Sequence, residues 1–251
     1  MKNNRILTIL TTFLIVAAII MYSIPVYIFL KNYSLNYYKE VYIGGDNIVL
    51  DYVANTDDNT ITTTNEYATI GTITYIDLEG NYGAIGHELN INSFKKGNIF
   101  ITPVESVIKS IPGKVGEKNV NLGFFNPNGS IDNIQKNGVY GKFTENVTNK
   151  DKFVVGMPKE IKKSDALLYT NIDGTEVKAY KIKIEKLYLF RQVRNIYIKI
   201  VDEELLEKTG GVIQGMSGSP IVQDGKIIGS LSHVDDKNPI YGYCLLITNM
   251  I

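Results

Sequence analysis

An uncharged apolar run near the N-terminus constrains the fold of this chain more than any other feature. The run extends from Ile6 to Leu30, and a helix of that length covers the roughly 30 Å hydrocarbon core of a bilayer. Lys2 and Arg5 precede it, so the positive-inside rule keeps the N-terminus in the cytoplasm. We therefore predict a cytoplasmic tip and one transmembrane helix over residues 1–30, with the remaining chain on the far side of the membrane.

A cleaved signal peptide is the alternative interpretation of the same run. A signal peptide has an apolar segment of about 7–15 residues followed by a small-residue cleavage site. The run is longer than that, and Ala17 and Ala18 lie in its middle. The pattern favours an uncleaved anchor.

Composition excludes several classes of function for the rest of the chain. Lys and Arg total 26 against 26 for Asp and Glu, which argues against a nucleic-acid partner bound through a broad basic face. One cysteine, Cys244, excludes an intramolecular disulfide framework. With only His87 and His233 there is little room for a histidine metal site, and phosphate-loop and dinucleotide fingerprints are absent. We expect no metal and no cofactor.

Beyond residue 31 the chain is predicted to be all-β. Apolar, β-rich runs alternate with turn pairs such as Asp173-Gly174 and Asp224-Gly225, which are strong hairpin signals. Only Asp202–Lys208 has a helical pattern, beginning at an N-cap residue and ending before Gly210-Gly211. The predicted strands are Asn47–Tyr52, Ala68–Ile76, Tyr82–Ile85, Asn98–Val107, Lys152–Val155, Ala166–Asn171, Glu176–Tyr188, Asn195–Val201, Pro220–Val222, Lys226–His233 and Ile240–Ile247. Many short strands at even spacing indicate a barrel or a sandwich.

A serine between glycines is the strongest candidate for chemistry. Gln214–Pro220 reads QGMSGSP and precedes an apolar strand, so Ser217 would stand on a sharp turn with its hydroxyl unobstructed. The backbone N–H groups of Gly215 and Ser217 are the natural donors of an oxyanion hole. A small-residue hairpin turn is the other reading of this motif.

A serine nucleophile needs a base and a carboxylate that orients the base. In a barrel serine protease the base comes early in the chain, which favours His87 and leaves His233 near the substrate pocket. Asp202 fits the order of histidine, aspartate and serine, although an aspartate at a helix start is also a routine N-cap. Asp77 and Asp165 are the alternatives. An α/β-hydrolase is disfavoured, because its G-x-S-x-G elbow and alternating helices are missing.

These residues carry a resemblance to a known family. Thr209–Gly229, TGGVIQGMSGSPIVQDGKIIG, closely resembles the signature of the SpoIVB peptidases (family S55), membrane-anchored serine proteases of endospore-forming bacteria. Tyr82–His87 (YGAIGH), Ile111–Lys118 (IPGKVGEK) and Ser232–Tyr243 (SHVDDKNPIYGY) fit the family as well. The resemblance covers residues 67–251, which we take as the peptidase domain.

The resemblance implies a trypsin-like double β-barrel and a triad of His87 as base, Asp202 as acid and Ser217 as nucleophile. It also implies a protease in the space between forespore and mother-cell membranes, where the family cleaves a membrane-bound regulator of sigma factor processing and cuts itself. The partners expected are therefore the membrane and a protein substrate. Residues 31–66, a juxtamembrane segment and polar loop, are too short for the PDZ domain of typical members. A catalytically inactive, membrane-tethered scaffold of the same fold is the alternative function.

Overall fold

The computed structural model describes residues 21, 39–55, 64–89, 93–120 and 126–251. The predicted anchor at Ile6–Leu30 lies outside these residues, except for Met21. Among the residues that are described, no helix has both the length and the apolarity needed to cross a membrane. The segment Glu40–Ile251 forms one compact unit, and the description below concerns that unit.

The first half of this unit is a closed barrel of six strands. Hydrogen bonds join the strands in the ring β3–β2–β5–β8–β9–β4, and a further pairing of β4 with β3 closes it. The strands are β2 (Asn47–Asn55), β3 (Thr64–Asp77), β4 (Asn81–Ala84), β5 (Ser93–Ile101), β8 (Gly129–Gln135) and β9 (Gly138–Phe143). Alternate inward side chains such as Ile48, Leu50 and Ile73 are fully buried and form its core.

The second half is another six-stranded barrel. Its ring runs β14–β11–β12–β13–β16–β15, and β15 pairs back with β14. The strands are β11 (Asp165–Asn171), β12 (Val177–Leu187), β13 (Ile196–Ile200), β14 (Pro220–Gln223), β15 (Lys226–Val234) and β16 (Tyr241–Leu246). Its own core includes Ile182, Ile198 and Leu231. Closing each sheet on itself removes exposed strand edges, which are prone to aggregation.

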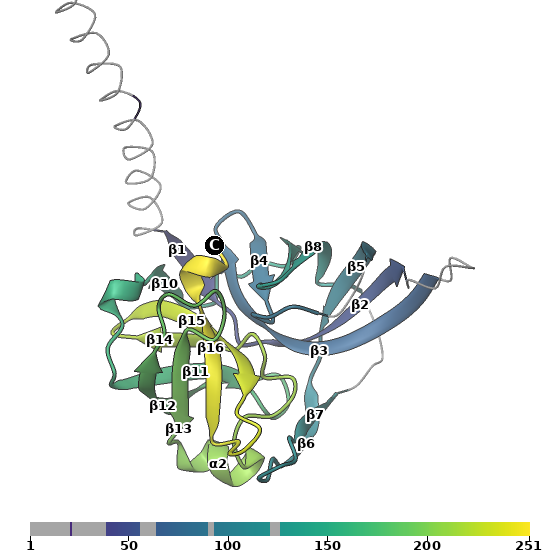
Figure 1. Cartoon of the computed structure of the whole chain (residues 1–251). Coiled ribbons are helices and arrows are strands. Elements are labelled where there is room, and N and C mark those ends of the chain that lie inside the picture. The colour runs from purple at the N-terminus through teal and green to yellow at the C-terminus, as the bar shows by residue number, and fades with distance from the viewer. Residues whose placement is uncertain (1–20, 22–38, 56–63, 90–92, 121–125) are drawn as a thin grey trace, which may run out of the picture. The chain divides into compact units, whose positions relative to one another are not determined.

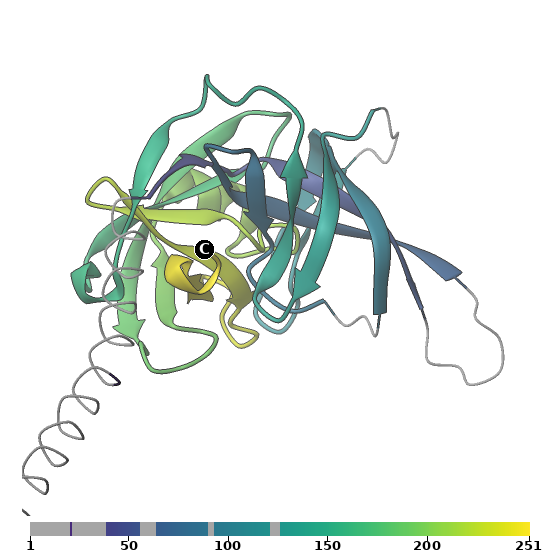
Figure 2. The ribbon, with the colours of Figure 1, turned by 90° about the horizontal axis from the view of Figure 1, so that it is seen from above.

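Two short strands and an apolar seam join the barrels. β1 (Glu40–Ile43) pairs with β3 of the first barrel and with β10 (Lys152–Val155), which pairs with β15 of the second. A third cluster of buried residues, including Val41, Tyr75 and Leu245, draws on both halves. The C-terminal 3-10 turn Ile247–Asn249 lies between the two groups of strands (Figure 2), and the Tyr75 hydroxyl donates to the Met250 carbonyl at 2.9 Å.

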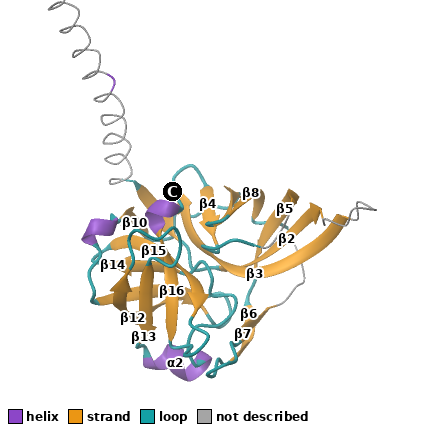
Figure 3. Ribbon diagram, viewed as in Figure 1, coloured by secondary structure: helices purple, strands orange, loops and turns teal. Residues whose placement is uncertain are grey.

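Helices are short and peripheral (Figure 3). α2 (Glu203–Thr209) follows β13, and the 3-10 turn Pro158–Glu160 follows β10. The hairpin of β6 (Val104–Ile108) and β7 (Glu117–Val120) extends beside α2 (Figure 1). The all-β prediction and its two-barrel arrangement are thus confirmed by the strand pairings.

Several strands differ from the sequence prediction. The predicted strand Asn98–Val107 is two strands, β5 and β6, because Pro103 lacks the N–H that would continue the ladder. β1, β7, β8 and β9 were not predicted. β2 belongs to the first barrel and β1 pairs with β3 of that barrel, so the folded unit begins before residue 67, the predicted start of the peptidase domain. Of the predicted polar loop before residue 67, residues 54–55 end β2 and residues 64–66 begin β3, while 56–63 lie outside the described part.

Candidate active site

The Ser217 turn depends on two glycines with positive φ. Gly215 has a backbone φ of 90° and Gly218 has a φ of 102°, values that residues other than glycine rarely adopt. A Cβ on Gly218 would also lie 1.9 Å from the carbonyl oxygen of Thr72, on β3 of the other barrel. The serine is therefore placed where the second barrel touches the first.

Two backbone N–H groups of this turn are free to bind an anion. Met216 N–H donates to Ile213, Gly218 N–H to Leu231 and Ser219 N–H to Met216. No hydrogen bond within the described structure uses the N–H of Gly215 or of Ser217. These are the two donors predicted for the oxyanion hole, and they remain candidates for that role.

The Ser217 hydroxyl points to the end of β15. Its Oγ donates to the carbonyl oxygen of Ser232 at 3.3 Å, while the Ser217 carbonyl accepts from Thr72 N–H at 2.8 Å. The described residues show no hydrogen bond between Ser217 and His87. The two candidate residues are therefore not joined to each other by a hydrogen bond in this structure.

His87 follows β4 on a tight backbone turn. Ile85 and Gly86 have φ of 71° and 66°, and Ile85 N–H donates to the Thr72 carbonyl at 3.2 Å. The ring of His87 is half-buried, and its Nδ1 lies 2.8 Å from the Glu88 carbonyl oxygen. Burial lowers the pKa of His87 below 6.5, and the bond to Glu88 partly opposes the shift. The imidazole is therefore neutral at pH 7, as a general base must be.

His233 lies beside His87. The two ring centroids are 5.3 Å apart, and His233 Nδ1 lies 3.0 Å from Ser232 Oγ, which donates to the Tyr243 carbonyl at 2.9 Å. Since that hydroxyl proton is used, Nδ1–H of His233 donates to it. Burial lowers the pKa of His233 to about 4. Repulsion from Arg194, and from His87 when that ring is protonated at low pH, lowers it further, and Asp236 opposes the shift.

Two neighbouring cavities share His233 as a wall. The smaller, about 220 Å³, is lined by Ser217, Ser232, His233 and Val212 with Arg194 and Asp236. The larger, about 870 Å³, is lined by His87 and His233 and by residues of both barrels such as Asn137 and Gln192. His233 thus lines a cavity beside Ser217, and its role as a substrate-pocket residue stays a prediction.

Asp202 lies at the start of α2. It is the N-cap of α2: Oδ1 accepts from Leu205 N–H and Oδ2 from Lys181 N–H, both at 3.1 Å. No contact between Asp202 and His87 occurs among the described residues. The structure brings Ser217, His87 and His233 together, and it does not bring Asp202 to them.

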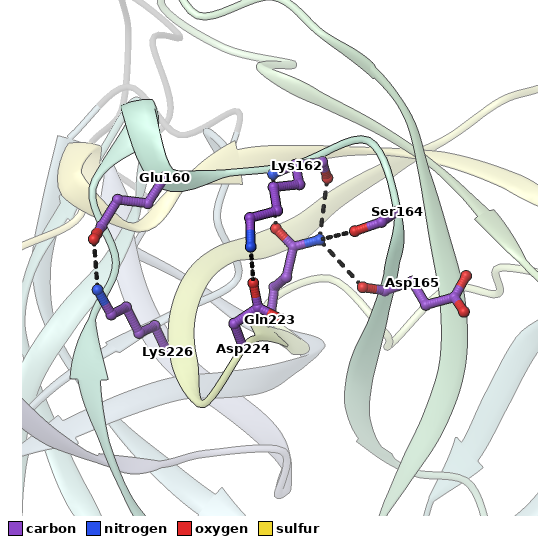
Figure 4. A network of polar contacts seen from close by, with 7 residues as sticks. All are labelled: Glu160, Lys162, Ser164, Asp165, Gln223, Asp224 and Lys226. Carbon is purple, nitrogen blue, oxygen red and sulfur yellow. Dashed lines mark hydrogen bonds and ion pairs between the residues drawn. The ribbon is translucent and has the colours of Figure 1, made fainter.

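Of the two alternative carboxylates, one is held in a turn and the other is exposed. Asp77 accepts from Glu79 N–H and from the backbone and side chain of Asn81 in the turn after β3. Asp165 begins β11 with an exposed side chain, and its carbonyl accepts from the buried Gln223 amide at 3.1 Å (Figure 4). In the same network Lys162 pairs with Asp224 and Lys226 with Glu160. This cluster stabilises the β14–β15 turn.

Sequence reasoning did not identify the residues that hold the site together. Thr72 Oγ1 donates to the Gly215 carbonyl and Thr74 Oγ1 to the Gly218 carbonyl, each at 2.7 Å. Buried threonines on one face of a strand have no sequence signal that points to a turn 143 residues away. Over the part of the chain that is described, no three His, Cys, Asp or Glu side chains are grouped so as to hold a metal ion.

The chain was compared with curated protein sequences and with solved structures. No curated protein sequence matches the chain. Two solved structures resemble it: the active form of the Rv3671c protease from M. tuberculosis and the HtrA-type protease AlgW with a decapeptide. The first is 12% identical with a TM-score of 0.44, and the match covers 82% of this chain and 77% of the other. The second is 11% identical with a TM-score of 0.43, and the match covers 84% of this chain and 62% of the other.

The family assignment comes from the sequence itself. The model of the family described as SpoIVB peptidase S55 matches residues 60–251, which is most of the chain and includes His87, Asp202, Ser217 and His233. The chain therefore belongs to the SpoIVB peptidase S55 family and is a serine endopeptidase.

Proposed function

We propose that this protein is a membrane-anchored serine endopeptidase that acts in sporulation signalling, with Ser217 as nucleophile and His87 as base. One observation carries the assignment of these two residues. Thr72 binds both halves of the site: its N–H and Oγ1 hold Ser217 and Gly215, and its carbonyl accepts from Ile85, two residues before His87. The serine turn and the histidine turn are thereby fixed on the same strand residue.

The proposed reaction uses only groups of this chain. The Ser217 hydroxyl exchanges its bond to Ser232 for one to His87 Nε2, and Oγ attacks the scissile carbonyl as the proton passes to His87. The N–H groups of Gly215 and Ser217 stabilise the oxyanion. His87 then protonates the leaving amine, and water hydrolyses the acyl-enzyme with the same base.

The cellular part of the proposal rests on the sequence and on the family. The uncharged run Ile6–Leu30 supports a single-pass anchor with a cytoplasmic N-terminus. The family supports a role between the forespore and mother-cell membranes, with a membrane-associated protein as substrate and self-cleavage near the N-terminus. The substrate pocket is formed by His233 and its neighbours.

Proteolysis is tested with the full-length protein and a peptide library. We expect new peptide termini with wild type and none with Ser217→Ala, and the residues around the new termini give the cleavage preference. The sporulation role is tested by placing Ser217→Ala in the bacterium that encodes the protein. Normal spore yield with the inactive variant would contradict that role while leaving the enzymatic assignment intact.

An inactive scaffold is the second candidate function. The observation in its favour is that Ser217 Oγ binds Ser232 rather than His87. A scaffold would form spores normally with Ser217→Ala and would release no new termini from the library.

A further inference from the structure

The loop between β12 and β13 exposes several apolar side chains. It comprises residues 188–195, and its tip reads Leu189-Phe190-Arg191-Gln192-Val193. Phe190 is fully exposed, and the side chains of Leu189 and Val193 are 36% and 41% exposed. Single exposed apolar residues are common on protein surfaces, whereas a group of them within one short loop marks a contact with an apolar partner.

Buried polar contacts hold this loop in its conformation. The side chain of Asn195 is fully buried, and its Nδ2 donates to the carbonyl oxygens of Arg191 at 2.5 Å and Tyr188 at 3.4 Å. Arg191 N–H donates to the Tyr188 carbonyl at 3.0 Å, which closes a turn around Leu189 and Phe190. The apolar tip is therefore presented on a fixed turn.

The charge around the tip is positive. From residue 186 to residue 201 the chain has two lysines, two arginines and no acidic residue. Arg191 and Arg194 are exposed, and their guanidinium groups lie over the rings of Tyr188 at 3.9 Å and Tyr243 at 5.4 Å. The ion pairs formed by the described residues include neither arginine. An apolar tip flanked by such cations is complementary to an anionic bilayer, where acyl chains lie below negative headgroups.

The loop lies at the end of the folded unit where the chain enters it. β13 leads from this loop to α2, and in Figure 1 the C-terminal turn and β1 lie at the end opposite α2. Asn249 of the C-terminal turn donates to the Gln192 carbonyl at 3.3 Å. Its neighbours Ile247 and Met250 share a buried cluster with Val41 of β1. The loop, the C-terminal turn and the first strand of the unit therefore share one end.

We propose that residues 189–193 insert into the surface of an anionic bilayer and dock the protease domain on the membrane. This proposal goes beyond the enzymatic assignment and rests on the anchor of the proposed function. Nine residues, 31–39, separate the predicted anchor from β1, and they span about 30 Å at most. So short a tether gives the loop a high effective concentration of bilayer surface, which offsets the small size of its apolar tip.

Docking through this loop would bring the candidate site to the bilayer. Gln192 and Val193 line the larger cavity together with His87 and His233. The loop therefore joins that cavity to the apolar tip. A membrane-associated substrate would then meet the cavity at the surface where its own chain leaves the bilayer.

The chain contains no tryptophan, so a single indole can report on the loop. Full-length Phe190→Trp is reconstituted into vesicles of phosphatidylcholine and phosphatidylglycerol, with and without brominated acyl chains, which quench an indole that reaches them. Ile111→Trp is the matched control, because Ile111 is 57% exposed at the tip of the β6–β7 hairpin, beside α2 (Figure 1). We expect brominated lipid to quench the emission of Phe190→Trp and to leave that of Ile111→Trp unchanged.

The anionic headgroup and the bilayer itself are tested separately. We expect weaker quenching of Phe190→Trp in vesicles of phosphatidylcholine alone, and weaker quenching when Arg191→Gln is added to it. Emission of Phe190→Trp that brominated lipid does not change would overturn the proposal, and so would equal quenching of the two tryptophan variants. A spectral shift that requires an added protein substrate instead of lipid would assign the loop to a protein partner and also overturn it.

Two further measurements separate this proposal from the proposed function. Phe13→Trp lies in the predicted anchor, so its quenching without that of Phe190→Trp would overturn insertion of the loop alone. If Phe13→Trp is not quenched, the anchor fails, while Phe190→Trp still reports whether the loop enters lipid. Labelling of Ser217 by a fluorophosphonate reports the protease assignment independently of either result.

Discussion

Lys118 is a fully buried lysine behind the Ser217 turn. Its side chain is 2% exposed, and Nζ has one hydrogen-bond acceptor, Thr170 Oγ1 at 3.4 Å. A Cβ added to Gly215 would lie 3.0 Å from Lys118 Cδ and 3.2 Å from Lys118 Cγ. The aliphatic part of the lysine side chain therefore fills the space behind Gly215. Burial lowers the pKa of Lys118 to about 7.

The low pKa of Lys118 makes the stability of the protein depend on pH. Between about pH 7 and the unperturbed pKa of about 10.4, the unfolded chain holds a proton that the folded chain has released, so stability rises with pH. We expect Lys118→Met to raise the free energy of unfolding most below pH 7. Its advantage should shrink by up to about 1.4 kcal/mol per pH unit above that.

Urea unfolding of the full-length protein from pH 6 to 10 measures this difference. Lys114→Met is the matched control, since Lys114 is exposed on the same hairpin. An advantage of Lys118→Met that is constant over this pH range would show that Lys118 does not titrate as described.

The pKa of His87 predicts the acid limb of the reaction. His87 must be neutral to accept the serine proton, and burial lowers its pKa below 6.5. We therefore expect the rate of fluorophosphonate labelling to fall as pH decreases, with a midpoint below 6.5. In His233→Gln the midpoint should also stay below 6.5. A wild-type midpoint near pH 7 or higher would contradict the assignment.

At this scale the sequence identified the candidate residues whose local motif is distinctive. Ser217 lies in a glycine-flanked turn and His87 follows a short strand, so both could be identified without the fold. The order of histidine, aspartate and serine along the chain favours Asp202. That order does not predict which hydrogen-bond donors surround its carboxylate. Lys118 and Thr72 matter through contacts with residues distant in sequence.

At the scale of elements, α2 shows how one side chain fixes a helix end. Asp202 caps the first turn and also binds Lys181 N–H, while Gly210 ends the helix with φ 67°. We expect Asp202→Ala to lower the free energy of unfolding by about 1–2 kcal/mol, and Asp202→Ser to recover most of the loss. Urea unfolding of the two variants measures this.

Glu203→Ala is the control for the cap. Glu203 is exposed in the same first turn and does not cap the helix. Its negative charge interacts favourably with the helix dipole, and this interaction contributes a few tenths to about 1 kcal/mol. An equal loss in Glu203→Ala and Asp202→Ala would show that charge, rather than the cap, accounts for the effect.

Strand prediction succeeded where turn residues bracket an apolar run. β10 and β11 are close to their predicted bounds, and so are the strands from β12 to β16. The β8–β9 hairpin was missed although Asn137-Gly138, a hairpin signal, lies at its turn, because its strands contain polar residues such as Asp132 and Lys142. A barrel strand with one exposed face lacks the continuous run of apolar residues by which a fully buried strand is recognised in a sequence.

At the scale of the whole molecule, the candidate site forms where the two barrels meet at β3. Which strands close each ring, β3 with β4 and β14 with β15, follows from pairing and could not be read from the sequence pattern. Thr72 is fully buried at this junction and contacts both halves of the site. The contact between the barrels therefore sets the geometry of the candidate site.

Removing the Thr72 hydroxyl tests this coupling. Thr72→Val keeps the side-chain shape and leaves the Gly215 carbonyl without its side-chain donor, which costs about 1–3 kcal/mol. We expect lower stability together with slower labelling of Ser217. Thr69→Val, on the same strand and half-buried, is the control. Labelling at the wild-type rate in Thr72→Val would show that this bond does not position the turn.

The most direct test of the account is the intact mass of the full-length protein after exposure to a fluorophosphonate. The account predicts a single adduct on wild type, and none on Ser217→Ala or His87→Ala, with all three proteins folded by circular dichroism. An adduct that persists in either variant, or a folded wild type that takes none, would contradict the claim that His87 activates Ser217.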